Sequence, residues 1–255
     1  MQKKEFKKHL LIATFLVAFL IISLFVSHTT HYQKSIIVYD DTKITTSSEP
    51  KAEKIYAKKI IKELREHYGN DDVVGKLTIK DTGIDTPIMQ SSNNDYYLNH
   101  NEYGSYQAEG SIYEDYRTSL DGKKVLIFGH SSPNWRVPFN ELEKYYDKSF
   151  YDTHKYITVT SEEDVYQYEI FSVYIETSDF SYMNLNIDDD TYNKYLQKYK
   201  DNSLYDTGVK IAVNDEIIIL QTCSNHSKYS SYKKKYLLVI GKKINKEEKN
   251  EKGTN

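Results

Sequence analysis

The chain has 255 residues and a formal net charge of −3, from 34 Lys and Arg against 37 Asp and Glu. The basic residues are scattered and only three are arginines, so no basic stripe indicates a nucleic-acid partner. The single cysteine excludes an internal disulfide, and no CxxC pair, HExxH motif or Gly-rich phosphate loop is present. We therefore expect no metal, no cofactor and no nucleic acid.

The first segment predicts a membrane anchor. Residues 1–9 are basic, and residues 10–27 are apolar or small and uncharged, which is enough for a short transmembrane helix. No small-residue cleavage site follows, so we interpret the segment as an uncleaved signal anchor rather than a removed signal peptide. The positive-inside rule then places the N-terminus in the cytoplasm and the remaining chain outside the cell membrane.

The next segments predict a stalk and a folded domain. Residues 28–50 are polar and rich in turn formers, as in an extracellular stalk. Residues 51–68 carry apolar side chains at helical spacing and predict the helix that begins a domain of residues 51–244. The charged residues 245–255 predict a disordered tail.

Within the domain the pattern changes to short strands. Apolar runs bounded by turn residues predict strands at residues 73–79, 84–89, 110–113, 123–129, 156–160, 166–175, 217–223 and 236–240. Short helical segments are predicted at residues 95–98, 139–146 and 188–200. Eight short strands with a few small helices predict a mainly β fold, a mixed and mostly antiparallel barrel.

Two of these strands end in chemically capable residues. One ends at His130 and the other at Cys223, and neighbouring barrel strands could bring both to one rim. A cysteine nucleophile must become a thiolate, and a histidine can hold the proton that this releases. His226, three residues past the cysteine, is a rival base. The structural alternatives are a small buried cysteine and a surface histidine.

Several motifs around these strands are similar to those of one enzyme family. Residues 220–223 (LQTC) resemble its TLxTC signature, with Ile219 replacing the first Thr, and residues 128–131 (FGHS) resemble its histidine strand. Supporting similarities lie at residues 86–88, 94–98, 110–115, 139–142 and 168–174. In this order, behind an anchor, they resemble the sortases, which are membrane-anchored cysteine transpeptidases of Gram-positive bacteria. The helices before the barrel and before the cysteine strand favour class B.

The resemblance implies an eight-stranded sortase barrel and a two-step acyl transfer. Cys223 would cleave a sorting signal, LPxTG- or NPxTN-like, after its Thr and form a thioacyl enzyme. An amine of a peptidoglycan precursor would resolve this intermediate, so that the substrate protein becomes attached to the cell wall. His130 would protonate the leaving amine and deprotonate the incoming one. Thr222 would contact the substrate or the oxyanion.

One departure from the family concerns an arginine at the start of the last strand. No Arg follows Arg136, and residues 230–236 (SSYKKKY) occupy the matching region. Counting from Cys223 gives Lys233, and counting back from Gly241 gives Lys235 or Tyr236; Lys235 is our candidate substitute. The missing arginine motivates an alternative, a sortase-like peptide-binding module that does not turn over. Other cell-wall cysteine enzymes fit less well, because papain-like amidases place Cys before His.

Overall fold

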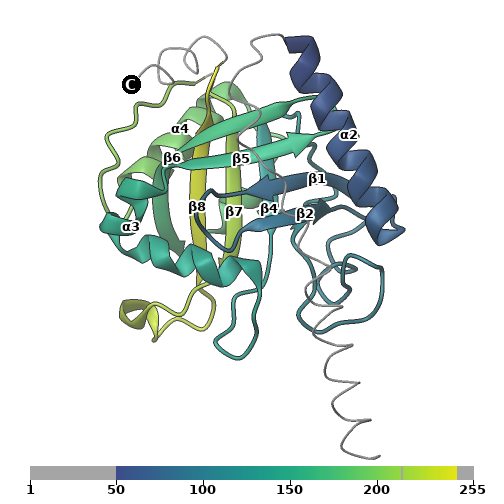
Figure 1. The fold of residues 1–255 in the computed structure, drawn as a ribbon. Helices are drawn as coiled ribbons and strands as arrows, with labels where there is room; N and C mark the ends of the chain where they lie inside the picture. The colour runs from purple at the N-terminus through teal and green to yellow at the C-terminus, as the bar shows by residue number, and fades with distance from the viewer. Residues whose placement is uncertain (1–49, 214, 246–255) are drawn as a thin grey trace, which may run out of the picture. The chain divides into compact units, whose positions relative to one another are not determined.

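Eight strands close into one barrel in the order β1-β2-β3-β4-β7-β8-β6-β5 (Figure 1). The computed structural model describes residues 50–213 and 215–245. The strands are β1 (Val73–Thr78), β2 (Asp85–Met89), β3 (Tyr113–Glu114), β4 (Lys124–Phe128), β5 (Tyr156–Ser161), β6 (Val165–Glu176), β7 (Ile217–Cys223) and β8 (Tyr236–Lys243). Only β2–β3 and β4–β7 pair in parallel, so the prediction of a mixed, mostly antiparallel barrel is confirmed.

Part of the prediction lies outside the described residues. This applies to the basic N-terminus (1–9), the anchor (10–27) and all but the last residue of the stalk (28–50). It applies also to all but the first residue of the tail (245–255). Within residues 50–213 and 215–245, no helix is long and apolar enough to cross a membrane.

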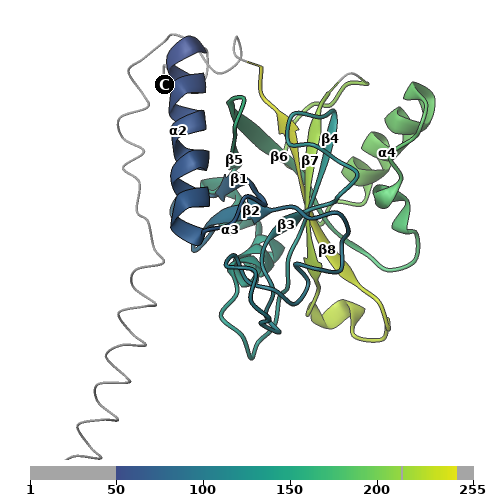
Figure 2. The same ribbon diagram turned by 90° about the vertical axis from the view of Figure 1, so that its right-hand side faces the viewer.

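Helices flank the barrel on two sides (Figure 2). Helix α2 (Pro50–Tyr68) occupies the segment whose apolar spacing predicts a helix, and it packs against β1 and β5. Helix α4 (Asp189–Asp201) lies on another side, against β6. The remaining helices are short: η2 (Pro138–Tyr146), α3 (Lys148–Thr153), η3 (Phe180–Met183) and η4 (Ser227–Tyr229).

Two details differ from the sequence prediction. Residues 95–98 form a bend and a turn without a helix after them, and the Asn93 carboxamide oxygen begins this turn by accepting the amides of Asp95 and Tyr96. The segment at 138–146 is a 3-10 helix, and α3 follows it without having been predicted. Asp147 caps α3 by accepting the amide of Ser149.

Strands β4 and β7 are buried on both faces, which explains why their sequences read as continuous apolar runs. Their inward side chains, such as Ile127 and Leu220, belong to the barrel core. Their outward side chains, such as Leu126 and Ile219, are equally inaccessible. The connection from β6 to β7, which contains η3 and α4, contacts this outer side: the Tyr192 hydroxyl donates to the Asp215 carbonyl just before β7.

Candidate active site

The two candidate catalytic residues, His130 and Cys223, follow or end the paired strands β4 and β7 at the same end. The parallel register matches Lys124 with Ile217 and Phe128 with Gln221. The Gly129 amide continues the ladder by donating to the Gln221 carbonyl at 3.2 Å. Continued for two residues past the paired strands, the same register would place His130 opposite Cys223. Neighbouring strands lie about 4.8 Å apart, so the sequence-distant residues become neighbours.

Strand alternation decides which way these side chains point. Ile127 on β4 and Leu220 on β7 face the barrel core, so Cys223, three residues after Leu220 and still in β7, projects from the outer face, and an extended chain past Phe128 would carry His130 to the same face. Cys223 is exposed and His130 is half-buried. A thiol and an imidazole therefore share an open surface, whose floor is the buried outer side of both strands.

Gly129 allows the histidine strand to pack closely before His130. A Cβ at this position would collide with the Ile112 side chain and lie 2.7 Å from a ring carbon of Phe139. No real Cβ is accommodated at that separation, so only glycine fits. The glycine of the Phe128-Gly129-His130 motif is thus explained by the close packing of Ile112 and Phe139 against the backbone before His130.

A backbone carbonyl fixes the tautomer of His130. The imidazole Nε2 lies 2.9 Å from the Leu98 carbonyl oxygen, which can only accept, so Nε2 carries the proton. This leaves Nδ1 as the nitrogen that can take up a proton. Gly110 supports the carbonyl: its φ is 59°, and an added Cβ would lie 2.6 Å from the Leu98 oxygen. Trp135 contacts the imidazole edge-on, with centroids 5.6 Å apart.

Electrostatics keep the thiol of Cys223 protonated at rest. Partial burial of the sulfur raises the thiol pKa above its usual value; the Lys235 charge opposes the rise and the Glu143 carboxylate adds to it. The thiolate is therefore not preformed, and a neighbouring base has to remove the proton as the sulfur attacks.

The 3-10 helix η2 braces both reactive strand ends. A 3-10 helix has three residues per turn, so every third side chain shares a face. Phe139, Leu142 and Tyr145 form the face buried in the core. The next face carries Asn140, Glu143 and Tyr146, and each of these makes a hydrogen bond to one or both of the loops after His130 and Cys223. Because of the period of three, one face of η2 packs in the core and the next face hydrogen-bonds the loops after His130 and Cys223.

Glu143 connects the two loops directly. Its Oε1 accepts hydrogen bonds from Ser131 Oγ and from Asn225 Nδ2, both at 2.7 Å. Ser131 follows His130 immediately, and Asn225 is two residues past Cys223. Sequence reasoning did not single out Glu143. The available signal was the period of three in PFNELEKYY, which places Glu143 next to an apolar face.

The two other polar residues of this face hold one loop each. Asn140 accepts the Ser132 amide at 2.8 Å and donates to the Trp135 carbonyl at 2.6 Å, which closes the loop after His130. The Tyr146 hydroxyl bonds Ser224 Oγ at 2.9 Å, beside the cysteine. Charge-assisted and neutral hydrogen bonds of this kind limit how far either loop can drift.

The lysines after Cys223 do not stand directly opposite the thiol. The β7–β8 register pairs Cys223 with Tyr236, whose ring packs on Phe180 at a centroid distance of 5.6 Å. Lys235 is half-buried beside the pair, and its carbonyl accepts the Ser224 amide at 3.0 Å. Lys235 is thus placed to act on the thiol through its charge, while Tyr236 occupies the facing position.

Two further candidates are placed away from the thiol. The Thr222 side chain is fully buried on the opposite face of β7 from Cys223, and its hydroxyl has no hydrogen-bond partner among the described residues. Its position does not support a side-chain role toward substrate or oxyanion. His226 caps η4 by accepting the Lys228 amide at 3.2 Å and packs on Tyr146, so its Nδ1 is occupied. The geometry favours His130 as the base.

No grouping of His, Cys, Asp and Glu that could hold a metal occurs in the part of the chain that the structure describes. The groups at hand are a thiol, an imidazole with a free Nδ1, and the hydrogen bonds that hold them. This set can carry acyl transfer by a covalent intermediate.

The comparisons with known proteins point to one family. A family model described as the sortase domain matches residues 77–243. Sortase B of Listeria monocytogenes is 40% identical over 180 residues, which cover 69% of this chain and 72% of the relative. Sortase B of Staphylococcus aureus is 30% identical over 173 residues, 67% of this chain and 70% of the relative.

Solved structures are similar over most of the chain. Sortase B from Listeria monocytogenes is 37% identical with a TM-score of 0.61, covering 71% of this chain and 98% of that one. A Staphylococcus aureus sortase B–substrate complex is 27% identical with a TM-score of 0.64, covering 78% and 100%. A sortase B complexed with triglycine gives the same four values.

Proposed function

Because the chain belongs to the sortase family, within class B, and is a cysteine transpeptidase, we propose that Cys223 is its nucleophile and His130 its general acid and base. The observation that carries this assignment is the parallel pairing of β4 with β7, which puts both side chains at one strand end and on one face. Each also has the chemistry that its step requires.

In the first step the thiol attacks the carbonyl carbon of the scissile peptide bond. The Cys223 proton moves to Nδ1 of His130, since Nε2 is committed to Leu98. The tetrahedral intermediate collapses by expelling the amine, which takes the proton from Nδ1. A thioester on Cys223 remains, and His130 is neutral again.

In the second step an amine attacks the thioester. His130 accepts a proton from the incoming amine and returns it to the departing sulfur, which regenerates the starting state of the enzyme. The raised pKa of the Cys223 thiol suits this return, because a less acidic thiol retains the proton at neutral pH. The Cys223 thiol is therefore both the proton donor of the first step and the proton acceptor of the second.

The substrate we propose is a C-terminal sorting signal, LPxTG- or NPxTN-like, cleaved after its Thr, with a peptidoglycan precursor amine as acceptor. The sortase B structures named for a substrate complex and for bound triglycine support a peptide and an amine as the two reactants. We also propose that residues 10–27, outside the described residues, anchor the protein in the cell membrane with its catalytic domain outside.

The test is intact-mass spectrometry of the full-length protein in detergent, incubated with peptides of the two sorting-motif types. We expect an acyl adduct on Cys223 that disappears when a triglycine amine is added, and no adduct on Cys223→Ala. Peptide cleavage by Cys223→Ala would contradict the proposal. So would a wild-type protein whose Cys223 reacts with iodoacetamide but forms no adduct with any peptide of the panel.

One observation favours a second function, a peptide-binding module without turnover. The register places Tyr236 opposite Cys223, in the region where the family carries an arginine. A tyrosine hydroxyl can donate one hydrogen bond to a developing oxyanion but brings no positive charge. Saturable peptide binding without a trapped thioester would favour this module over the enzyme.

A further inference from the structure

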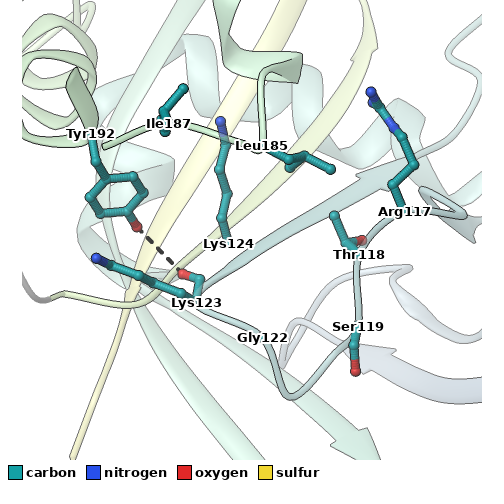
Figure 3. Close-up of a pocket in the computed structure, with 9 residues that line it drawn as sticks. All are labelled: Arg117, Thr118, Ser119, Gly122, Lys123, Lys124, Leu185, Ile187 and Tyr192. Carbon is teal, nitrogen blue, oxygen red and sulfur yellow. Dashed lines mark hydrogen bonds between the residues drawn. The ribbon is translucent and has the colours of Figure 1, made fainter. Parts of the chain in front are cut away.

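A cavity lined by basic residues lies at the other end of β4. It has a volume of about 230 Å³ and adjoins a second one of about 480 Å³, with which it shares Arg117, Leu185 and Ile187. Figure 3 shows Lys123 and Lys124 on one wall and Arg117 on another, with Tyr192 and the segment before α4 closing the space. The cavity lies at the start of β4, whereas His130 follows the strand's end.

The lining is one-sided in charge. Among the described residues, three cations and no carboxylate line these two adjoining cavities. A cavity beside α2 provides the contrast, because its lining holds carboxylates as well as cations: Lys58, Lys62 and Arg65 with Glu66, Asp71 and Glu162. There Glu66 pairs with Lys62 at 3.6 Å and Glu162 pairs with Arg65 at 3.1 Å.

Lys124 is the cation left without a counter-charge. Its amine donates to the Asn184 carbonyl at 2.8 Å, and within the described residues no carboxylate forms an ion pair with it. Lys123 pairs with Asp189 at 3.0 Å, and Arg117 makes a two-pronged contact with Asp115. Lys124 projects into the cavity between Leu185 and Ile187, as Figure 3 shows.

We propose that this cavity binds the anionic group, a phosphate or a carboxylate, of a small organic molecule. The Lys124 amine would pair with the anion, which replaces part of the hydration that burial removes. Lys123, on the same wall, adds positive potential. Leu185, Ile187 and the Tyr192 ring offer an apolar surface to the organic body. This site is separate from the reaction at Cys223 and does not depend on its assignment.

The experiment measures binding of phenyl phosphate, benzoate, inorganic phosphate and neutral phenol to the full-length protein by calorimetry. Backbone amide shifts of Gly122 and Lys123 in NMR spectra locate the binding. We expect saturable binding of phenyl phosphate and benzoate, weaker binding of inorganic phosphate, and none of phenol. Lys124→Gln should weaken phenyl phosphate binding at least about tenfold, the cost of one charge-assisted contact.

Two variants keep the test decisive. Lys124→Arg retains the charge and should retain binding, so a loss in Lys124→Gln alone cannot be ascribed to misfolding. Lys62→Gln removes a cation from the cavity beside α2 and should have no effect. The proposal is overturned if no organic anion binds saturably, if phenol binds as well as phenyl phosphate, or if Lys124→Gln binds like the wild type.

The pH dependence gives an independent readout. Burial, followed by the neighbouring Arg117 charge, lowers the pKa of Lys124 to about 8. The other charged or titratable groups facing it are Lys123 with its partner Asp189, Tyr192, and Tyr195 at 5.8 Å. Because only the protonated amine attracts an anion, phenyl phosphate should bind more weakly as pH rises from 7 to 9. Binding that is equally strong at both pH values would contradict a role for Lys124.

Discussion

The outer face of β4 has a different kind of polar residue at each end. His130 lies two residues past the last residue of the strand and Lys124 is its first residue, and an even spacing of six residues would put both on the same face of an extended chain. His130 is held by the Leu98 carbonyl, and the loop after it is held by η2. Lys124 has a single carbonyl partner in a cavity of cations.

The difference separates two ways of preparing a site. At the His130 end, hydrogen bonds fix positions, and the Glu143 carboxylate is used twice as an acceptor. Such a site is preorganised and needs only its substrate. At the Lys124 end, the Lys124 amine has no carboxylate partner among the described residues, and a bound anion would balance its charge. The first arrangement suits covalent chemistry, and the second suits reversible binding.

The largest expected effect tests the His130 end itself. His130→Ala should reduce the rate of sorting-peptide cleavage by roughly 10²- to 10⁴-fold, the usual contribution of a general acid and base. Cys223→Ala should abolish cleavage, because no thioester can form. Steady-state cleavage of a fluorogenic sorting peptide measures both. His226→Ala is the matched control and should retain most of the activity, since His226 caps η4. A larger loss in His226→Ala than in His130→Ala would reverse the assignment.

The next effect concerns Glu143 as the connection between the two loops. Glu143→Ala removes the acceptor for both Ser131 and Asn225 and should lower kcat by up to ~10²-fold through misplacement of the reacting groups. Glu143→Gln keeps an oxygen that accepts both bonds and should lose much less. Glu141→Gln, on the same helix but paired with Lys144, serves as control. Equal activity in Glu143→Ala and wild type would show that η2 does not position the pair.

The sequence predicts where the strands lie better than it predicts which strands pair and which side chains contact them. β4 and β7 are identifiable because both faces are buried, which leaves an unbroken apolar run. Their parallel pairing joins residues 93 positions apart and has no local signal, so the sequence predicted only that neighbouring barrel strands could bring His130 and Cys223 to one rim. Sequence reasoning missed Glu143, whose role depends on a 3-10 period that mimics an α-helix over nine residues.

The choice of Lys235 shows a similar limit. Counting residues cannot decide which of residues 233–236 faces the cysteine, because the length of the intervening turn is unknown. The register settles on Tyr236 as the facing residue. The cavity at Lys124 was also invisible, since a lysine at the start of a strand is typical of a solvated edge.

A smaller effect should appear in the pH dependence of Cys223 alkylation. The Lys235 charge favours the thiolate and the Glu143 charge disfavours it, so Lys235→Gln should raise the midpoint of the iodoacetamide rate profile and Glu143→Gln should lower it. Each change in rate at neutral pH should stay below about fivefold, as expected for partly exposed charges. Lys234→Gln, at an exposed position, should leave the midpoint unchanged. Shifts of the opposite sign would mean that Lys235 acts on cleavage by another route.

The smallest expected effect is that of a change at the Lys124 end of β4 on peptide cleavage at the His130 end. Lys124 and His130 are six residues apart along an extended strand, or about 20 Å. This exceeds the Debye length of ~8 Å at physiological ionic strength, so the Lys124 charge is screened from the reacting groups. Lys124→Gln should therefore leave kcat/KM for peptide cleavage within about twofold of wild type, although it weakens phenyl phosphate binding. A tenfold loss of cleavage would mean that the two ends are coupled. The segment that contains η3 would be the physical route. At one end of it the Asn184 carbonyl accepts a hydrogen bond from the Lys124 amine, and at the other Phe180 packs on Tyr236, which pairs with Cys223.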